Sequence, residues 1–194
     1  MRSRYLTDNE IAALRSKMSA SEWLPVRVSL ETGLRVGDVV KIRPDDIRGN
    51  FLHYTAEKTG KAGKVKIKNS LAKTLKFAGA GEMWCFPSPK DREKHITRQA
   101  VWSRVKRAAK RSGVDLRGVS PHSLRKVFAV KLYTAEGLKA VQQALQHSNL
   151  ATTELYTLSD WTSGENADRP LLRADLPVLI QKVVEVVISH LDKT

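Results

Sequence analysis

The sequence is organised around Leu145-Gln-His-Ser-Asn-Leu-Ala-Thr-Thr-Glu-Leu-Tyr-Thr157, which holds two side chains capable of chemistry, His147 and Tyr156. Taken alone, this stretch is typical of a helix end followed by a polar turn with a packed tyrosine. It gains meaning from three upstream segments: an arginine flanked by glycines, a lysine-rich hairpin, and a His-x-x-Arg sequence at a helix start. These segments could gather cationic and proton-transferring groups around one phosphate.

The charge balance indicates a polyanionic partner. The chain has 194 residues, enough for one core with an appendage, and a net charge of +14. Residues 154–194 contain seven acidic and four basic residues, a net charge of −3, so residues 1–153 carry +17. A surplus of this size usually means nucleic acid, although a merely soluble basic surface is the alternative.

Other function classes lose support from the composition. The single cysteine, Cys85, cannot form an internal disulfide, and its apolar neighbours predict a buried structural thiol in a reducing compartment. Neither a signal peptide nor an apolar run of about 20 residues is present, so we expect a soluble, cytoplasmic protein without membrane contact. No Cys/His cluster or carboxylate pair has ligand spacing, so no metal or cofactor is expected.

Helical periodicity and helix-end signals dominate the chain. Thr7 and Glu10 form a capping-box pattern, and Ser120-Pro121 is a strong helix start. The expected helices cover residues 8–18, 22–32, 34–40, 71–77, 98–112, 121–136 and 138–146, with Asn69 or Ser70 as the cap of the fourth. Residues 51–55 and 65–68 read as strands. The fold class is therefore mainly α (α+β), with a small antiparallel sheet or hairpin.

Two regions present dense positive charge. The turn predicted over Glu57–Lys64 holds three lysines and two glycines, and residues 90–131 contain thirteen Lys/Arg but only three acidic residues. A solvated helix face is the simpler interpretation of the second region, but its near-uniform sign favours phosphate contact. The candidate DNA-binding side chains are Lys61, Lys64, Arg98, Arg104, Lys106, Arg107, Lys110 and Arg111.

The C-terminal part has a different character. Residues 164–168 read as a linker, and residues 177–191 form an apolar segment whose apolar arc is too wide for a lone surface helix. A strand is the less favoured alternative, because the polar positions do not alternate. We expect this segment to be a helix that docks on this chain or on another copy.

One set of residues could carry out chemistry on a phosphodiester: Arg35, Lys58, His122, Arg125, His147 and Tyr156. Two guanidinium groups can hold the non-bridging oxygens and stabilise a five-coordinate transition state. A tyrosine oxygen can attack phosphorus, although its ordinary pKa of about 10 requires a base or neighbouring positive charge. A histidine suits the proton transfer, and a lysine can protonate the leaving 5′ oxygen.

The order and the local sequences of these motifs resemble those of the catalytic domain of the tyrosine recombinases, the phage integrase family. The resemblance covers about residues 5–160 and rests on Thr32-Gly-Leu-Arg-Val-Gly-Asp38, Lys58-Thr-Gly60, Pro121-His-Ser-Leu-Arg125, Leu145-Gln-His147 and Thr152-Thr-Glu-Leu-Tyr156. Gln146 departs from the pattern, because the family usually has glycine there. The family's N-terminal core-binding domain is also expected to be absent, leaving a catalytic domain over 1–163 and a linker with a C-terminal helix over 164–194.

The resemblance implies a role for each matched residue. Arg35 and Arg125 would bind the scissile phosphate, and Lys58 would be the general acid, with Lys61 and Lys64 as competitors on the turn.

The resemblance assigns the remaining roles to four residues. His122 would accept the proton of Tyr156, which would form a 3′-phosphotyrosine. His147 would donate a hydrogen bond to the phosphate, and Asp38 would orient the arginine and histidine groups from behind.

The function implied by the resemblance is site-specific DNA recombination or integration. Its partner would be double-stranded DNA of the nucleoid, a virus or a mobile element, and the C-terminal helix could support self-association on DNA. Two alternatives stay open: a type IB topoisomerase, in which lysine typically replaces His122, and an inactive DNA-binding remnant.

Overall fold

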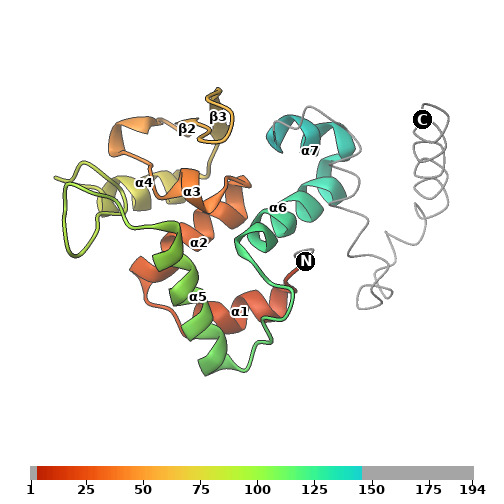
Figure 1. Ribbon diagram of the computed structural model, residues 1–194. Helices are drawn as coiled ribbons and strands as arrows, with labels where there is room; N and C mark the ends of the chain where they lie inside the picture. Colours follow the sequence, from red (N-terminus) through yellow and green to blue (C-terminus); the bar gives the residue numbers. More distant parts are fainter. Residues whose placement is uncertain (1–3, 146–194) are drawn as a thin grey trace, which may run out of the picture. The chain divides into compact units, whose positions relative to one another are not determined.

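The computed structural model describes residues 4–145 and is mainly helical, with one small antiparallel sheet (Figure 1), as the sequence predicts. The first elements are α1 (Asp8–Ser16), α2 (Ala20–Thr32), α3 (Val36–Val39), a 3-10 turn (Pro44–Asp46), β1 (Ile47–Arg48), β2 (Phe51–Thr55) and β3 (Ala62–Lys66). They are followed by α4 (Asn69–Ala78), α5 (Arg98–Ser112), α6 (Pro121–Glu136) and α7 (Leu138–Leu145). The predictions for His147, Tyr156 and residues 164–194 fall outside the described residues.

The chain divides into two compact units within α6, between Lys131 and Leu132. The described part of the first unit, residues 4–131, contains the sheet and the helices from α1 to the greater part of α6. The described part of the second unit consists of the end of α6 and α7, in which Val141 and Leu145 are buried. Within residues 4–145, none of the helices combines the length and hydropathy needed to cross a bilayer.

Local signals set most helix ends. Thr7 and Glu10 form the predicted capping box, and Thr97 accepts a hydrogen bond from Ala100 at the start of α5. The predicted start of α2 is wrong by two residues, because Ser19 caps the helix. The predicted cap of α4 is also wrong: Asn69 already lies inside the helix, and no side chain caps it.

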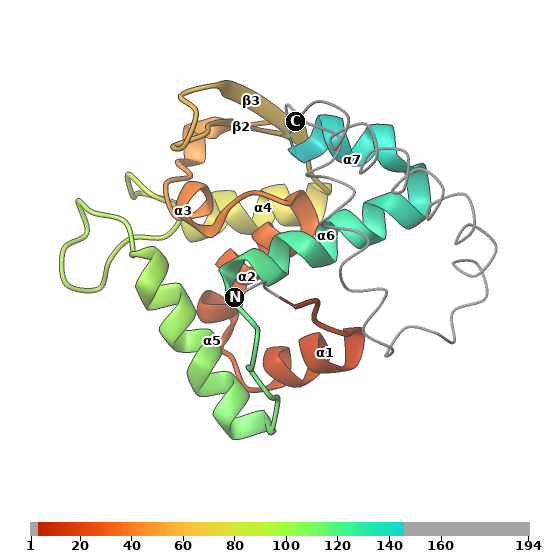
Figure 2. The ribbon, with the colours of Figure 1, turned by 45° about the vertical axis from the view of Figure 1, so that its right-hand side comes forward.

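The core of the first unit lies where α1, α2, α3 and α5 pack together (Figure 2). Leu14 of α1, Val28 of α2 and Val101 of α5 are almost completely buried there. Burial of each side chain stabilises the fold by roughly 1.5–3 kcal/mol relative to leaving it exposed. Leu52 of β2 and Leu71 of α4 belong to the same cluster. The sheet is therefore anchored on its inner face to the helices that carry it.

The sheet has the order β1-β2-β3, and both of its pairings are antiparallel. Its outer face carries Arg48, Phe51, His53, Lys64 and Lys66, because residues opposite each other across a ladder share a face. The predicted long turn is wrong in one respect: β3 begins at residue 62, three residues earlier than expected. Lys64 consequently lies within a strand, where its ammonium group is 5.4 Å from the centre of the Phe51 ring.

Candidate active site

The link between α2 and α3 places Arg35. Gly33 ends α2 with φ +70°, which favours glycine, and a Cβ there would lie only 2.4 Å from the Phe128 ring of α6. The buried hydroxyl of Ser29 donates to the Leu34 carbonyl at 2.8 Å, which fixes the residue that follows the turn. Arg35 then directly precedes α3, half-buried at its start.

Asp38 connects α3 to the turn after β2. Its side chain is buried, and its Oδ1 accepts a hydrogen bond of 2.9 Å from the backbone N–H of Glu57. The carboxylate of Glu57 forms an ion pair of 3.0 Å with Lys41, which lies just beyond α3. The residue immediately before Lys58 is therefore held by both its backbone and its side chain.

The turn that carries Lys58 is tighter than the sequence suggests. The carbonyl of buried Ala56 accepts hydrogen bonds from the backbone N–H groups of Thr59, at 3.2 Å, and Gly60, at 2.8 Å. The N–H of Ala56 in turn donates to the Lys61 carbonyl at 2.9 Å. Lys58 is exposed at the middle of this closed turn, which limits the positions that its ammonium group can reach.

The N-terminal turn of α6 supplies the other two site residues. The N–H of His122 donates to Oγ of Ser120 at 3.2 Å, and the N–H of Ser120 donates to Oγ of Ser123 at 3.1 Å. Arg125 is buried one turn further on, and its Nη1 donates to the Gly33 carbonyl at 2.7 Å. This bond ties α6 to the link that places Arg35.

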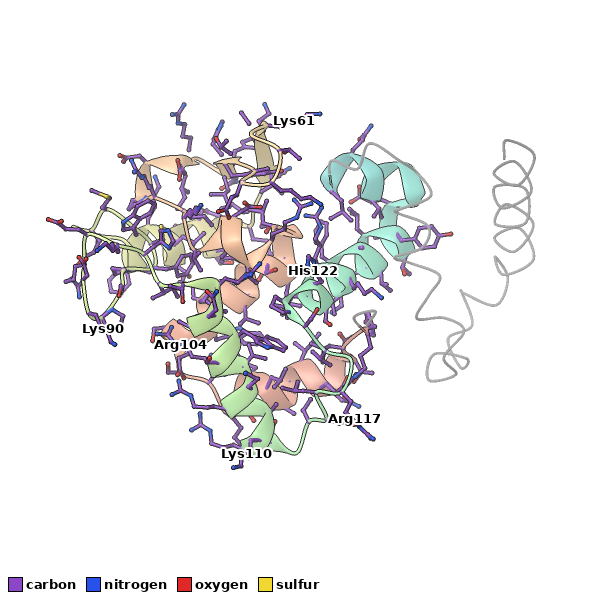
Figure 3. All side chains as sticks on the ribbon, in the orientation of Figure 1. Lys61, Lys90, Arg104, Lys110, Arg117 and His122 are labelled. Atoms are coloured by element: carbon purple, nitrogen blue, oxygen red, sulfur yellow. The ribbon has the colours of Figure 1, made fainter. Side chains whose placement is uncertain are left out.

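Positive charges converge on His122, which Figure 3 labels at the start of α6. Partial desolvation lowers the pKa of His122, and the charges of Arg35, Arg125, Arg98 and Lys58 lower it further. Among residues 4–145, no carboxylate lies within ion-pairing distance of Arg35, Lys58 or Arg98. The site therefore combines a neutral imidazole at pH 7 with unbalanced positive charge, which suits an anion.

Tyr54 is a member of this neighbourhood that the sequence analysis missed. It lies on the inner face of the sheet, half-buried against the core. Burial raises the pKa of Tyr54 and the charge of Asp38 adds to the rise, against the opposing effects of Arg125 and Arg35. The alternation of β2 could have indicated its inward position, but not its proximity to the arginines.

The basic helix α5 differs from its prediction in one respect. The run has few acidic residues in sequence, but Glu22 of α2 forms an ion pair of 3.2 Å with Arg107. A backbone hydrogen bond from Ser19 lowers the pKa of Glu22, and the charges of Arg107 and Arg104 contribute. Arg111 donates to the Lys17 carbonyl at 3.1 Å. Part of the charge on α5 is thus used within the protein.

The structure separates the predicted site residues into three groups. Arg35, Lys58, His122 and Arg125 come together with Arg98, and Asp38 accepts the backbone N–H of Glu57, the residue before Lys58. Lys61 lies in the turn before β3 and Lys64 on the outer face of the sheet, whereas the other basic candidates lie on α5, where Figure 3 labels Arg104 and Lys110. His147 and Tyr156 belong to the part of the chain that the structure does not describe.

Residues 4–145 contain neither a metal-binding cluster nor a reactive cysteine. Within residues 4–145, no three His, Cys, Asp or Glu side chains lie close enough to hold a metal ion. Cys85 is buried as predicted, and desolvation raises the pKa of its thiol to about 12. A thiol with that pKa is a poor nucleophile at neutral pH.

The phage integrase family model matches residues 4–162, most of the chain. The chain is 29% identical over 172 residues to the tyrosine recombinase XerD of Pasteurella multocida (strain Pm70), covering 79% of this chain and 57% of that protein. In general, the chain spans about half the length of the curated relatives that it matches.

Two solved structures share the fold. A lambda integrase dimer bound to a COC' core site gives a TM-score of 0.73 at 23% identity, covering 87% of this chain and 51% of that chain. The XerH site-specific recombinase bound to palindromic difH substrate, in a post-cleavage complex, gives a TM-score of 0.67 at 22% identity, covering 86% and 53%. The helices and the small sheet therefore have the fold of the lambda integrase and XerH structures. The chain belongs to the phage integrase family.

Proposed function

We propose that residues 1–163 form the catalytic domain of a site-specific DNA recombinase that cleaves and rejoins DNA through a covalent 3′-phosphotyrosine. The observation that carries this proposal is the group of four cationic side chains around neutral His122, three of them without a carboxylate partner among residues 4–145. A phosphodiester is the anion that this arrangement fits, since its two non-bridging oxygens can accept from both guanidinium groups. The DNA named for the lambda integrase and XerH complexes supports the choice of ligand.

The chemical step uses residues from separate parts of the chain. The Tyr156 oxygen attacks phosphorus, its proton passes to His122, and the bond from phosphorus to the 5′ oxygen breaks as Lys58 protonates that oxygen. Religation reverses both transfers: the 5′ hydroxyl gives its proton to Lys58 and attacks phosphorus, and the bond from phosphorus to Tyr156 breaks as His122 returns the proton to the tyrosine oxygen. No atom or electron is needed beyond the DNA and the protein.

Arg35 and Arg125 stabilise the extra negative charge of the five-coordinate transition state. The two play different parts. Arg125 is buried and braced by the Gly33 carbonyl, so it presents a fixed donor, whereas Arg35 is half-buried and can adjust to the DNA. His147 supplies a further donor to the same phosphate. Asp38 orients the site by fixing the N–H of Glu57, and so the turn that carries Lys58.

Lys58 is a better candidate for the general acid than its two competitors. Its charge acts on His122, so it lies near the residue that receives the nucleophile's proton. Lys64 is committed to the outer face of the sheet by its contact with Phe51, and Lys61 lies at the end of the closed turn. We propose that Lys61 and Lys64 bind flanking DNA together with the basic side chains of α5.

The C-terminal segment would control assembly. We propose that a linker over residues 164–168 precedes an apolar helix over 177–191, which docks on this chain or on a neighbouring copy on DNA. Removal of residues 175–194 should change self-association or solubility, as measured by sedimentation with and without DNA. Unchanged sedimentation and unchanged thermal stability would refute a docking role.

The experiment that tests the function uses a nicked suicide duplex, which loses a short strand after cleavage and traps the covalent state. DNA fragments selected from a random pool by the protein itself supply the substrate. End-labelled strands should show a covalent adduct that retains the label upstream of the cut and leaves a free 5′ hydroxyl. Equal adduct from Tyr156→Phe would show that another residue is the nucleophile.

A further inference from the structure

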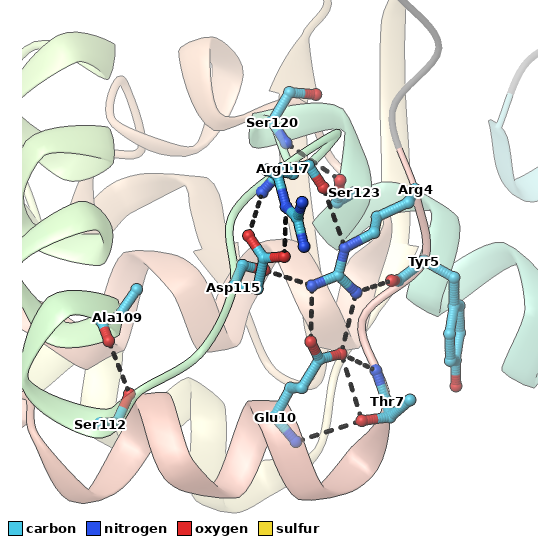
Figure 4. Close-up of polar contacts among 10 residues, drawn as sticks. All are labelled: Arg4, Tyr5, Thr7, Glu10, Ala109, Ser112, Asp115, Arg117, Ser120 and Ser123. Carbon is cyan, nitrogen blue, oxygen red and sulfur yellow. Dashed lines mark hydrogen bonds and ion pairs between the residues drawn. The ribbon is translucent and has the colours of Figure 1, made fainter. Parts of the chain in front are cut away.

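Arg4, which lies in the segment before α1, is hydrogen-bonded to the loop between α5 and α6 (Figure 4). Its backbone N–H donates to the Gly118 carbonyl at 2.6 Å, and its Nε donates to the Arg117 carbonyl at 3.1 Å. Its Nη2 also donates to the Asp115 carbonyl. Three carbonyls of one short loop therefore accept hydrogen bonds from one residue that precedes them by more than a hundred positions.

The guanidinium of Arg4 is itself held in place by Glu10. Nη2 lies 2.6 Å from Oε1, and Nη1 lies 3.1 Å from Oε2, a bidentate pairing with fixed orientation. Oε2 also accepts from the N–H of Thr7 at 2.8 Å, as the capping box of α1 requires. Burial acts to raise the pKa of Glu10, but hydrogen bonds from Arg4 and Thr7 outweigh it and lower the pKa.

The loop that Arg4 holds leads directly into the active-site helix. The N–H of Val119 donates to the Leu116 carbonyl at 2.9 Å, which shapes the two residues before Ser120. Ser120 then accepts the N–H of His122 on its hydroxyl, and the N–H of Ser123 on its carbonyl at 2.9 Å. His122 follows Gly118 by only four positions, so a displaced loop would move the histidine.

We infer that Arg4 is a positioning residue for the phosphate site, which fixes the loop over 115–118 and thereby the first turn of α6 with His122 and Arg125. The inference rests on the proposed function, because positioning has a readable consequence only if this turn contacts the scissile phosphate. Misplacing a reacting group by about 1 Å can cost roughly a hundredfold in rate. Arg4 would thus act on the chemistry without contacting DNA.

A matched control separates positioning from general stabilisation. Arg27 and Glu31 form an ion pair on α2 with the same N–O distance of 2.6 Å, and their side chains are 28% and 28% exposed. The corresponding values for Arg4 and Glu10 are 29% and 22%. Arg27→Ala therefore removes an ion pair with the same shortest N–O distance and similar exposure, in which Arg27 bonds Glu31 through Nε alone and, within residues 4–145, makes no hydrogen bond to the loop over 115–118.

The experiment compares wild type, Arg4→Ala, Arg4→Lys and Arg27→Ala in single-turnover formation of the covalent adduct at saturating DNA, and by NMR titration of His122. We expect Arg4→Ala to lower the rate roughly ten- to hundredfold, with a much smaller change in the DNA concentration for half-saturation. The titration of His122 should move toward its ordinary range. Arg4→Lys should restore little, because an ammonium group cannot reproduce the bidentate fork.

Glu10→Gln keeps the proposal testable if Arg4→Ala fails to fold. Glutamine is accepted at this position of a capping box, so α1 keeps its cap while the guanidinium loses its charged partner. We expect Glu10→Gln to lower the rate of adduct formation less than Arg4→Ala does. The inference is overturned if the folded Arg4 and Glu10 variants show the wild-type rate and the wild-type His122 titration, or only the changes seen in Arg27→Ala. Absence of adduct from wild type would instead contradict the proposed function, while the His122 titration would still test the role of Arg4.

Discussion

The site around His122 and the outward face of α5 are both strongly basic, yet the protein treats their charge differently. Around His122, the charges of Arg35, Arg98 and Lys58 have no carboxylate partner among residues 4–145, and they act together on one imidazole. On α5, Arg107 is paired with Glu22, and Arg111 is bound to a backbone carbonyl. The number of basic residues is therefore a poor guide to a site. Positive charge that has no carboxylate partner and is held by rigid neighbours is a better guide to a binding site.

Arg125 and Arg111, which each donate to a backbone carbonyl in one of the two regions, give the largest expected contrast. Arg125→Gln should lower adduct formation by about a thousandfold, because it removes a transition-state donor. It should also destabilise the fold by about 1.5–3 kcal/mol, because the Gly33 carbonyl loses a charge-assisted bond at a buried site. Arg111→Gln removes a similar bond at an exposed site and should leave the single-turnover rate at saturating DNA unchanged. Equal losses in single-turnover rate and in Tm would erase the distinction between the regions.

The turn lysine gives the next contrast. Lys58→Ala should slow cleavage by about 10²–10⁴-fold, the usual contribution of a general acid. A substrate with sulfur at the 5′ bridging position should recover most of the rate, because a thiolate leaves without protonation. Lys64→Ala, which loses the same charge from β3, should cleave at the wild-type rate at saturating DNA and should gain no rate from the sulfur substrate. If sulfur rescues Lys64→Ala rather than Lys58→Ala, the acid has been assigned to the wrong residue.

The titration of His122 should report the unbalanced charge directly. In the free protein its pKa should lie below the ordinary value of about 6.5, because desolvation and the four cations disfavour the imidazolium. Because the folded state disfavours the imidazolium, the fold has its full stability at pH values above the ordinary pKa, where His122 is neutral. Stability is lost as the pH falls from the ordinary pKa through the lowered pKa of the folded state. Arg98→Gln should raise the pKa of His122, and Arg104→Gln should not. Binding of DNA to Tyr156→Phe should raise it as well, since the phosphate offsets the cations; NMR titration checks each case.

The smallest expected effects concern α5 itself. Loss of a lysine that contacts a phosphate should reduce the slope of log affinity against log salt by about 0.9. Lys106→Gln and Lys110→Gln should each show this reduction, whereas Arg107→Gln should show less, because its guanidinium is partly occupied by Glu22. Fluorescence anisotropy over a range of salt concentrations measures the slopes. A full reduction for Arg107→Gln alone would indicate that the ion pair opens on DNA.

Much of the fold could be predicted from local signals, because helix ends are set by residues close in sequence. Thr7, Thr97 and Gly33 act where their sequence context places them. The start of α2 was misplaced because Ser19 and Ser21 are both possible caps in the sequence, and only Ser19 has a glutamate three residues later that completes a capping box. The hairpin was predicted too loose, because the bonds that close it at Ala56 are between backbone groups.

The site was predictable as a set of residues but not as an arrangement. His122 and Arg125 follow from the helix start at Ser120-Pro121, but the burial of Arg125 against the Gly33 carbonyl joins residues far apart in sequence. The same holds for Glu22, which pairs with Arg107 of α5, and for Tyr54, whose pKa is affected by the charges of Arg125 and Arg35. No local pattern encodes these contacts, since each depends on the packing of two or more elements.

The central claim is that the cations around His122 serve a phosphate attacked by Tyr156, and peptide mapping of the trapped adduct tests it most directly. The protein is incubated with the suicide duplex, digested with protease and nuclease, and analysed by mass spectrometry. The account predicts one nucleotide-bearing peptide, with the phosphate on Tyr156, and its loss in both Tyr156→Phe and Arg125→Gln. A phosphate mapped to any other residue, or an undiminished adduct in Arg125→Gln, would contradict the account.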